Sequence, residues 1–149
     1  MEKLNVNLFR ITVVVNPLTL PPSNGNVPVD APDGITLLCN DIIVGERANN
    51  MSLLIPQGIA VIGFYVITLP GGTAGIAPAS FANTPIEWQD DVSANAFLVQ
   101  NWNSGHFTVV DFNTVRLRSE HPFNVFVSYS GVTYFSDPTI INEPPMPTG

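Results

Sequence analysis

The sequence predicts an all-β fold: one antiparallel β-sandwich, jelly-roll-like, with little or no helix. Three observations predict it. Short segments alternate apolar and polar residues, as strands with one buried face do. Turn-forming residues separate these segments in a chain of 149 residues that holds 14 Pro and 11 Gly. No segment keeps the 3.6-residue period of an amphipathic helix. We expect one domain over residues 1–141 and an extended or disordered tail over residues 142–149.

The expected strands follow one another with loops of unequal length. The first covers residues 9–15, and a loop rich in Pro and Asn follows it. Residues 59–69, IAVIGFYVITL, are apolar throughout, which predicts a long strand buried on both faces. Residues 70–85 form a second long loop, and residues 90–96 favour a helical turn. Shorter strands are expected at residues 35–38, 41–44, 51–55, 86–88, 97–100, 106–110 and 115–118.

Residues 123–140 hold the clearest strand pair. The alternation of the first strand fixes its register, because a slip of one residue would move its apolar side chains to the wrong face. Ser130-Gly131 closes the turn, with Gly131 at positive φ. The return strand covers residues 132–135, and Asp137-Pro138 ends it. His121, which precedes a proline, is expected to mark the turn into this hairpin.

The charge of the chain excludes some partners. The net charge is −7, with only five Lys and Arg. Phosphate backbones and anionic membrane surfaces need clustered positive charge, so we expect neither nucleic acid nor membrane as a partner. Only 11% of the residues are charged, so little repulsion opposes self-association and we expect a homo-oligomer or a higher assembly. The first residues lack the apolar segment of a secretory signal, which predicts a cytoplasmic protein.

Few residues favour a metal or a cofactor, and we expect no cofactor. Cys39 follows an apolar run, so we interpret it as a small buried hydrophobic residue. The paired acids Asp30 with Asp33 and Asp90 with Asp91 offer carboxylates for calcium. They lack EF-hand spacing, and Asp favours turns for local reasons, so turns are the preferred interpretation.

Trp102 is the residue that most favours a ligand. It stands between Asn101 and Asn103, and an indole beside amide groups suits a sugar ring, which has an apolar face and a polar rim. Trp88, which stands between Glu87 and Gln89, is a second candidate for the same kind of contact. The alternative for each is a half-buried tryptophan at a strand end.

Ser104, His106 and Asp111 are the residue types of a hydrolase triad. A triad needs the three side chains in hydrogen-bond reach of one another, and the nucleophile-elbow motif is absent. We therefore expect a turn serine and a surface histidine, and no enzyme.

The C-terminal segment resembles a known bacterial family. Residues 134–140, YFSDPTI, are similar to the end of the AidA/PixA-type inclusion body proteins, and residues 11–16, ITVVVN, resemble their first strand. Ser136 stands where the family carries an aromatic residue. The resemblance implies a compact β-sandwich without known catalysis that forms abundant cytoplasmic inclusions.

Three functions follow as expectations. The first is a non-enzymatic, self-associating protein of the inclusion-body type. The second is a carbohydrate-binding, lectin-like sandwich that uses Trp102. The third is a structural subunit of a virus or a filament, because jelly-roll subunits share this composition.

Overall fold

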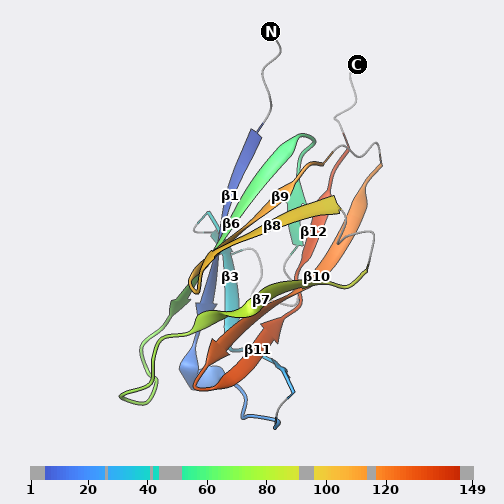
Figure 1. Cartoon of the computed structure of the whole chain (residues 1–149). Helices are drawn as coiled ribbons and strands as arrows, with labels where there is room; N and C mark the ends of the chain where they lie inside the picture. Colours follow the sequence, from blue (N-terminus) through green and yellow to red (C-terminus); the bar gives the residue numbers. More distant parts are fainter. Residues whose placement is uncertain are drawn as a thin grey trace.

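Two β-sheets pack face to face in this chain, seen in a computed structural model (Figure 1). The structure describes residues 6–25, 27–40, 42–43, 52–90, 96–113 and 117–144, with the backbone alone at 42–43. The first sheet has the strand order β4-β3-β1-β6-β9-β8. Its strands are β1 (Val6–Val15), β3 (Ile35–Cys39), β4 (Ile42–Ile43), β6 (Ile59–Thr68), β8 (Phe97–Asn103) and β9 (His106–Asp111).

The second sheet is built around the longest strand, β10. One edge of β10 pairs with β7, and the other pairs with β11 and then β12, which in turn pair with β2 and β5. These strands are β2 (Val29–Asp30), β5 (Ser52–Ile55), β7 (Ser80–Trp88), β10 (Ser119–Tyr129), β11 (Val132–Ser136) and β12 (Thr139–Asn142). A short 3-10 helix, η1 (Pro17–Thr19), follows β1.

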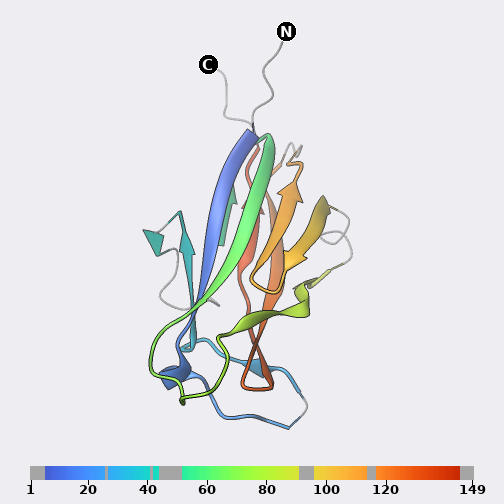
Figure 2. The same cartoon turned by 60° about the vertical axis from the view of Figure 1, so that its left-hand side comes forward.

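The all-β sandwich is confirmed, although both sheets are mixed rather than purely antiparallel. β1 and β6 run parallel over their whole length, with Val6 opposite Ile59 and Val15 opposite Thr68 (Figure 2). β2 with β11 and β5 with β12 are also parallel. Alternation determines which face of a strand is buried, but it carries no information about the direction of the neighbouring strand.

The predicted hairpin is confirmed, and it continues further than expected. Ser130 and Gly131 both have positive φ, at 53° and 74°, as a two-residue turn of type I′ requires. Asp137-Pro138 does not end the pairing, because β12 continues along β10 in the register that β11 began. The Pro138 carbonyl still accepts from the Phe123 amide at 3.0 Å, so the proline removes only a donor.

Three phenylalanine side chains form the centre of the core between the sheets. The ring of Phe64 stacks on that of Phe107 at 4.5 Å between centroids and meets Phe123 of the other sheet edge-on at 6.2 Å. All three side chains are fully buried. Cys39 is also buried, and burial raises the pKa of its thiol, as expected of a small hydrophobic residue.

Strand β6 corrects the expectation that it is buried on both faces. Ala60, Ile62 and Phe64 point into the core, whereas Tyr65 and Ile67 on the other face are exposed to 39% and 47%. Pattern reasoning failed here because both faces of β6 are apolar, while only the inner face is covered.

Several boundaries also differ from prediction. Residues 80–85, expected in the second long loop, belong to β7, and His121 lies inside β10 rather than in a turn. An extended residue before a proline is as compatible with a strand as with a turn. Asn142, where the tail was expected to begin, is the buried last residue of β12. The expected helical turn at 90–96 falls largely outside the described residues, as do 44, 114–116 and 145–149.

Candidate functional site

Trp102 lies at a β-bulge in β8, the edge strand of the first sheet. Asn101 pairs with Phe107 and Asn103 pairs with His106, so the register shifts at the residue between them. Bulges turn a side chain away from its regular direction and are common beside functional sites. Trp102 is 56% exposed, which is a large exposure for a tryptophan.

Trp102 is nevertheless held in place. Its Nε1 donates to Thr108 Oγ1 at 2.8 Å, and that hydroxyl lies 3.4 Å from His106 Nε2. The His106 ring is nearly parallel to the indole, with centroids 6.1 Å apart, and stacks on Tyr65 at 4.3 Å. Trp102, His106 and Tyr65, from three neighbouring strands, thus form a row of aromatic rings on the outer face of the first sheet.

A hollow of about 320 Å³ lies beside this aromatic row, and we name it the outer-face hollow. Gly63 and Thr108 are among its lining residues, together with Leu8 and Val61. A side chain at Gly63 would meet the Tyr65 ring, because an added Cβ would lie 3.1 Å from it. The glycine therefore gives the Tyr65 ring room to lie over the sheet.

A second hollow of about 230 Å³ lies between β7 and the turn that joins β8 to β9. Its wall carries the carboxamides of Asn83, Asn101 and Asn103, and we name it the Asn-lined hollow. The Phe81 amide donates to the Ser104 carbonyl at 2.6 Å, which ties β7 to the turn. Asn103 Oδ1 accepts from the Gly105 amide at 2.8 Å, which fixes the orientation of that carboxamide.

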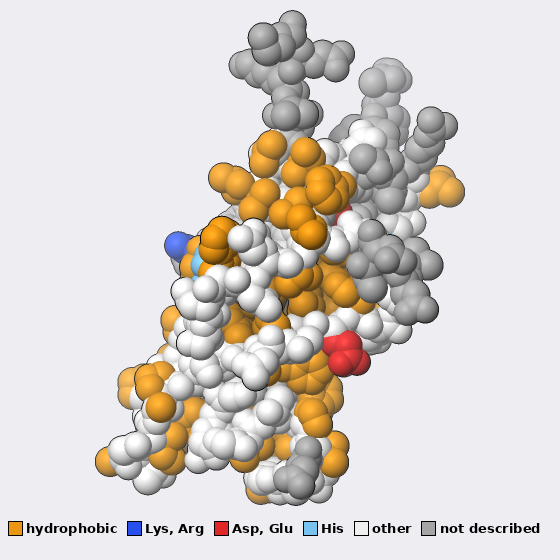
Figure 3. All heavy atoms as spheres, viewed as in Figure 1, with side chains coloured by type: hydrophobic (Ala, Val, Ile, Leu, Met, Phe, Trp, Pro, Cys, Tyr) orange, Lys and Arg blue, Asp and Glu red, His pale blue; other side chains and the backbone are white. Residues whose placement is uncertain are grey.

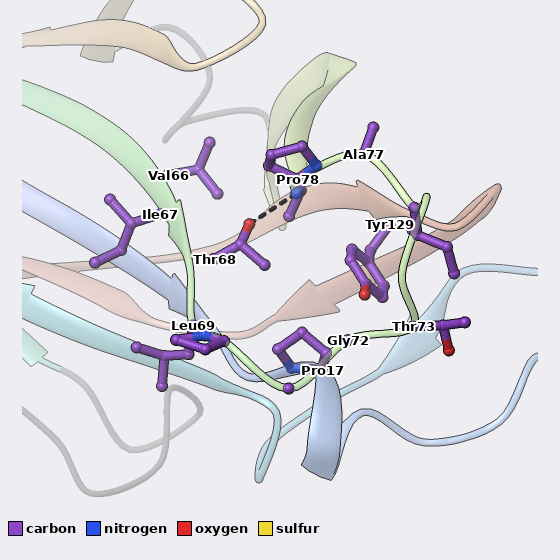
Figure 4. A pocket seen from close by; sticks show the side chains of 14 residues that line it. Pro17, Val66, Ile67, Thr68, Leu69, Gly72, Thr73, Ala77, Pro78 and Tyr129 are labelled. Carbon is purple, nitrogen blue, oxygen red and sulfur yellow. Dashed lines mark hydrogen bonds between the residues drawn. The ribbon is translucent and has the colours of Figure 1, made fainter.

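A third hollow lies at the end of the sandwich where β6 ends. It has a volume of about 580 Å³ and is lined by the end of β6, the loop over residues 70–79, and Tyr129 (Figure 4). The Ala79 amide donates to Thr68 Oγ1 at 2.7 Å, which closes the loop onto the strand. The Tyr129 hydroxyl occupies the place that a Cβ of Gly72 would take. The lining of this hollow is mostly Pro, Gly and aliphatic residues, with few groups that would orient a polar ligand.

Trp88 is not brought to the Trp102 site. Its ring stacks on Phe97 at 4.1 Å and lies 5.3 Å from Phe123, so it packs against the core. Phe97 begins β8 and Asn103 ends it, which places the two tryptophans at opposite ends of that strand.

The hydrolase residues do not converge. His106 lies on the outer face of β9, whereas Asp111 points into the core from the other face of the same strand. Ser104, Asn101, Asn103 and Trp102 do lie together, around the Asn-lined hollow. Three of the residues predicted to bind a ligand, Trp102, Asn101 and Asn103, thus line one hollow, and their role stays a prediction.

The calcium candidates lie on separate elements. Asp30 ends β2, Asp33 lies in the following turn and Asp90 follows β7, while Asp91 lies outside the described residues. Across the part of the chain that the structure describes, no three His, Cys, Asp or Glu side chains are grouped to hold a metal ion.

No helix among the described residues has the length and apolarity needed to cross a membrane.

A buried polar cluster, which the sequence did not reveal, joins the two sheets at the end of β9. Asp111 Oδ1 accepts from the Asn113 amide at 3.0 Å and from Asn142 Nδ2 at 3.1 Å. Asn113 Nδ2 donates in turn to the carbonyls of Ile55 and Pro56 at 3.0 and 2.8 Å. Among the described residues, Asp111 Oδ2 has no hydrogen-bond partner. Burial raises the pKa of Asp111, against the lowering effects of its hydrogen bonds and of His121.

Sequence reasoning missed the partners that complete the Trp102 site. Tyr65 was assigned to a buried strand, Asn83 to a loop, and His106 to an isolated surface position. Their positions depend on strand order, since β6, β7 and β9 come together from distant parts of the chain. One signal was present: the glycine at position 63, inside an apolar strand, is typical of a place where another group approaches the backbone closely, and here that group is the Tyr65 ring.

No family model matches the chain, and a search of curated proteins found no match either.

Proposed function

We propose that this chain binds neutral carbohydrate at Trp102. The observation that carries the proposal is a tryptophan ring that is both exposed and fixed: it is 56% exposed, yet its Nε1 is bonded to Thr108 Oγ1 at 2.8 Å. An exposed ring that is already ordered loses little conformational entropy when a ligand covers it.

The surroundings of Trp102 supply both kinds of contact that a sugar needs. The C–H face of a pyranose packs on an aromatic ring, and its hydroxyls need donors and acceptors around the rim. The carboxamides of Asn83, Asn101 and Asn103 offer both within one hollow. Among the described residues, Arg10 is the one Asp, Glu, Lys or Arg residue that lines either hollow, and the net charge of the chain is −7, so the proposal is restricted to neutral sugars.

A glycan array probed with the native chain and with Trp102→Ala tests this proposal. The native chain should bind a set of neutral glycans, and the variant should lose that binding. Phe112→Ala is the matched control, because Phe112 is an exposed aromatic residue that lines neither hollow. Binding that survives in Trp102→Ala, or the absence of binding by the native chain, contradicts the proposal.

Self-association is a second candidate function, and the outer face of the first sheet favours it. The register aligns Leu8, Val61, Val110 and Leu98 in one row across four strands. Leu8 is 73% exposed, and Leu98, Val6 and Ile67 are exposed on the same face. Hydrophobic side chains gather where β1 and β6 begin, and charged groups are sparse on the face in view (Figure 3). Such an apolar surface favours association with a second copy, as an inclusion-body-type protein requires.

Light scattering coupled to size exclusion tests this second candidate. The native chain should show a mass that rises with concentration, and Leu8→Lys should shift it to the monomer. Leu18→Lys is the matched control, because Leu18 is also 73% exposed but follows β1 in η1. A native chain that stays monomeric at high concentration rejects self-association. Closed or helical particles in electron micrographs would favour a virus or filament subunit instead.

A further inference from the structure

We infer that the Trp102 site takes an oligosaccharide, with linked sugar units on both sides of the indole, rather than a single sugar. This inference rests on the proposed carbohydrate function and specifies the ligand class. Its basis is the position of Trp102 between two separate hollows.

The two hollows share one described residue, and it is Trp102. The outer-face hollow is otherwise lined from β1, β6 and β9, and the Asn-lined hollow from β7 and the end of β8 with its turn. Because β8 is the edge strand of its sheet, the bulged indole stands where the outer face meets the side of the sandwich. A ligand that crosses the indole therefore enters both hollows.

The volumes support a ligand longer than one unit. Pockets that bury most of a drug-sized ligand have volumes of roughly 300–1,000 Å³, and a single sugar is smaller than such a ligand. The Asn-lined hollow, at about 230 Å³, falls below that range, and the outer-face hollow, at about 320 Å³, lies at its lower end. Each hollow is therefore of a size for one small unit, and a ligand that occupies both must have at least two linked units.

The two hollows also differ in chemistry in a way that suits successive units of a chain. In the outer-face hollow, the stacked rings of Tyr65 and His106 continue the aromatic surface of Trp102. In the Asn-lined hollow, three asparagines and Ser104 supply polar groups around the same indole. One unit thus stacks mainly on rings, and its neighbour is held mainly by hydrogen bonds.

Isothermal titration with glucose, cellobiose, cellotriose and cellotetraose, and with the matching malto-, chito- and manno-series, tests the inference. In the series that binds, affinity should rise about tenfold or more from the single sugar to the trimer, a gain of about 1.4 kcal/mol. Tyr65→Ala, which alters only the outer-face hollow, and Asn83→Ala, which alters only the other, should each reduce the trimer affinity toward that of the single sugar.

Two controls separate these effects from damage to the fold. Tyr65→Phe keeps the ring and should retain the native affinity, and Asn24→Ala removes an exposed carboxamide that lines neither hollow. A single sugar that binds as tightly as the trimer, or a trimer affinity sensitive to only one of the two variants, overturns the oligosaccharide inference and leaves the proposed function standing. No binding in any series overturns both.

Discussion

Replacing Asp111 with Asn should remove a loss of stability that the native protein suffers as the pH rises. Asp111 is fully buried, and burial raises its pKa in the folded state above the value of about 3.9 for an unfolded chain. The folded state therefore holds the proton more tightly than the unfolded state. The stability from this group is fully present below about pH 3.9 and is lost as the pH rises through the folded pKa.

The size of the effect follows from proton linkage. Between the two pKa values, the folded chain binds one proton more than the unfolded chain at this site, so the free energy of unfolding falls by about 1.4 kcal/mol per pH unit. Asn at position 111 keeps an oxygen that can accept from the Asn113 amide and from Asn142 Nδ2, and it does not titrate. The interaction with His121 lowers the pKa of Asp111, so it reduces this effect without reversing the direction that burial sets.

Urea denaturation of the two proteins at a series of pH values from 4 to 7 measures this difference. The native chain should lose stability relative to Asp111→Asn as the pH rises, with unchanged m-values. A difference that does not vary with pH would refute the reasoning, and so would a native chain that gains stability relative to the variant.

Three further predictions concern single positions. Gly72→Ala should destabilise the fold by about 1 kcal/mol, because its Cβ would overlap the Tyr129 hydroxyl and the Tyr129 ring would have to shift. Thermal melts measure this loss, and the double variant with Tyr129→Phe should recover most of it. Gly105→Ala is the control and should be nearly neutral, because its Cβ would lie at an ordinary 3.5 Å from Asn103 Oδ1. Ser130→Asn should stabilise the hairpin by up to about 1 kcal/mol, since Asn tolerates the positive φ of this turn better than Ser; a loss of stability contradicts the turn assignment. The Cys39 thiol should resist a thiol reagent until the protein unfolds, because it is buried with a raised pKa, and rapid labelling of the native protein would contradict that burial.

The sequence predicted the parts of the fold that depend on local pattern. Alternation placed Ile11, Val13 and Val15 correctly in the core, and the Ser130-Gly131 turn was found from its residue types alone. Patterning could not determine the parallel pairing of β1 with β6, because no local residue preference distinguishes a parallel from an antiparallel neighbour. Nor could it show which face of β6 is covered, since both faces are apolar.

Of the residues around Trp102, the sequence pointed only to its two neighbours in the chain. Trp102, Asn101 and Asn103 are consecutive in the chain, but a regular strand would point Trp102 away from its two neighbours. The bulge at Trp102, which depends on the pairing of β8 with β9, could not be predicted from residue types. Tyr65 and Asn83 join Trp102 through the order of strands in the two sheets, which contacts between distant segments determine. The polar cluster of Asp111 and Asn142 was missed for the same reason, since its members are joined across the core.

The two indole N–H signals of the protein offer the most direct measurement of the central claim. The chain has two tryptophans, so a proton–nitrogen correlation spectrum resolves one signal for Trp102 and one for Trp88. Titration with cellotetraose, maltotetraose, chitotetraose and mannotetraose should shift the Trp102 signal with at least one of them, because a sugar would cover a ring that is now exposed. The Trp88 signal should stay in place, since that ring packs against Phe97 and Phe123. A Trp102 signal that no neutral oligosaccharide moves would contradict carbohydrate binding at this site.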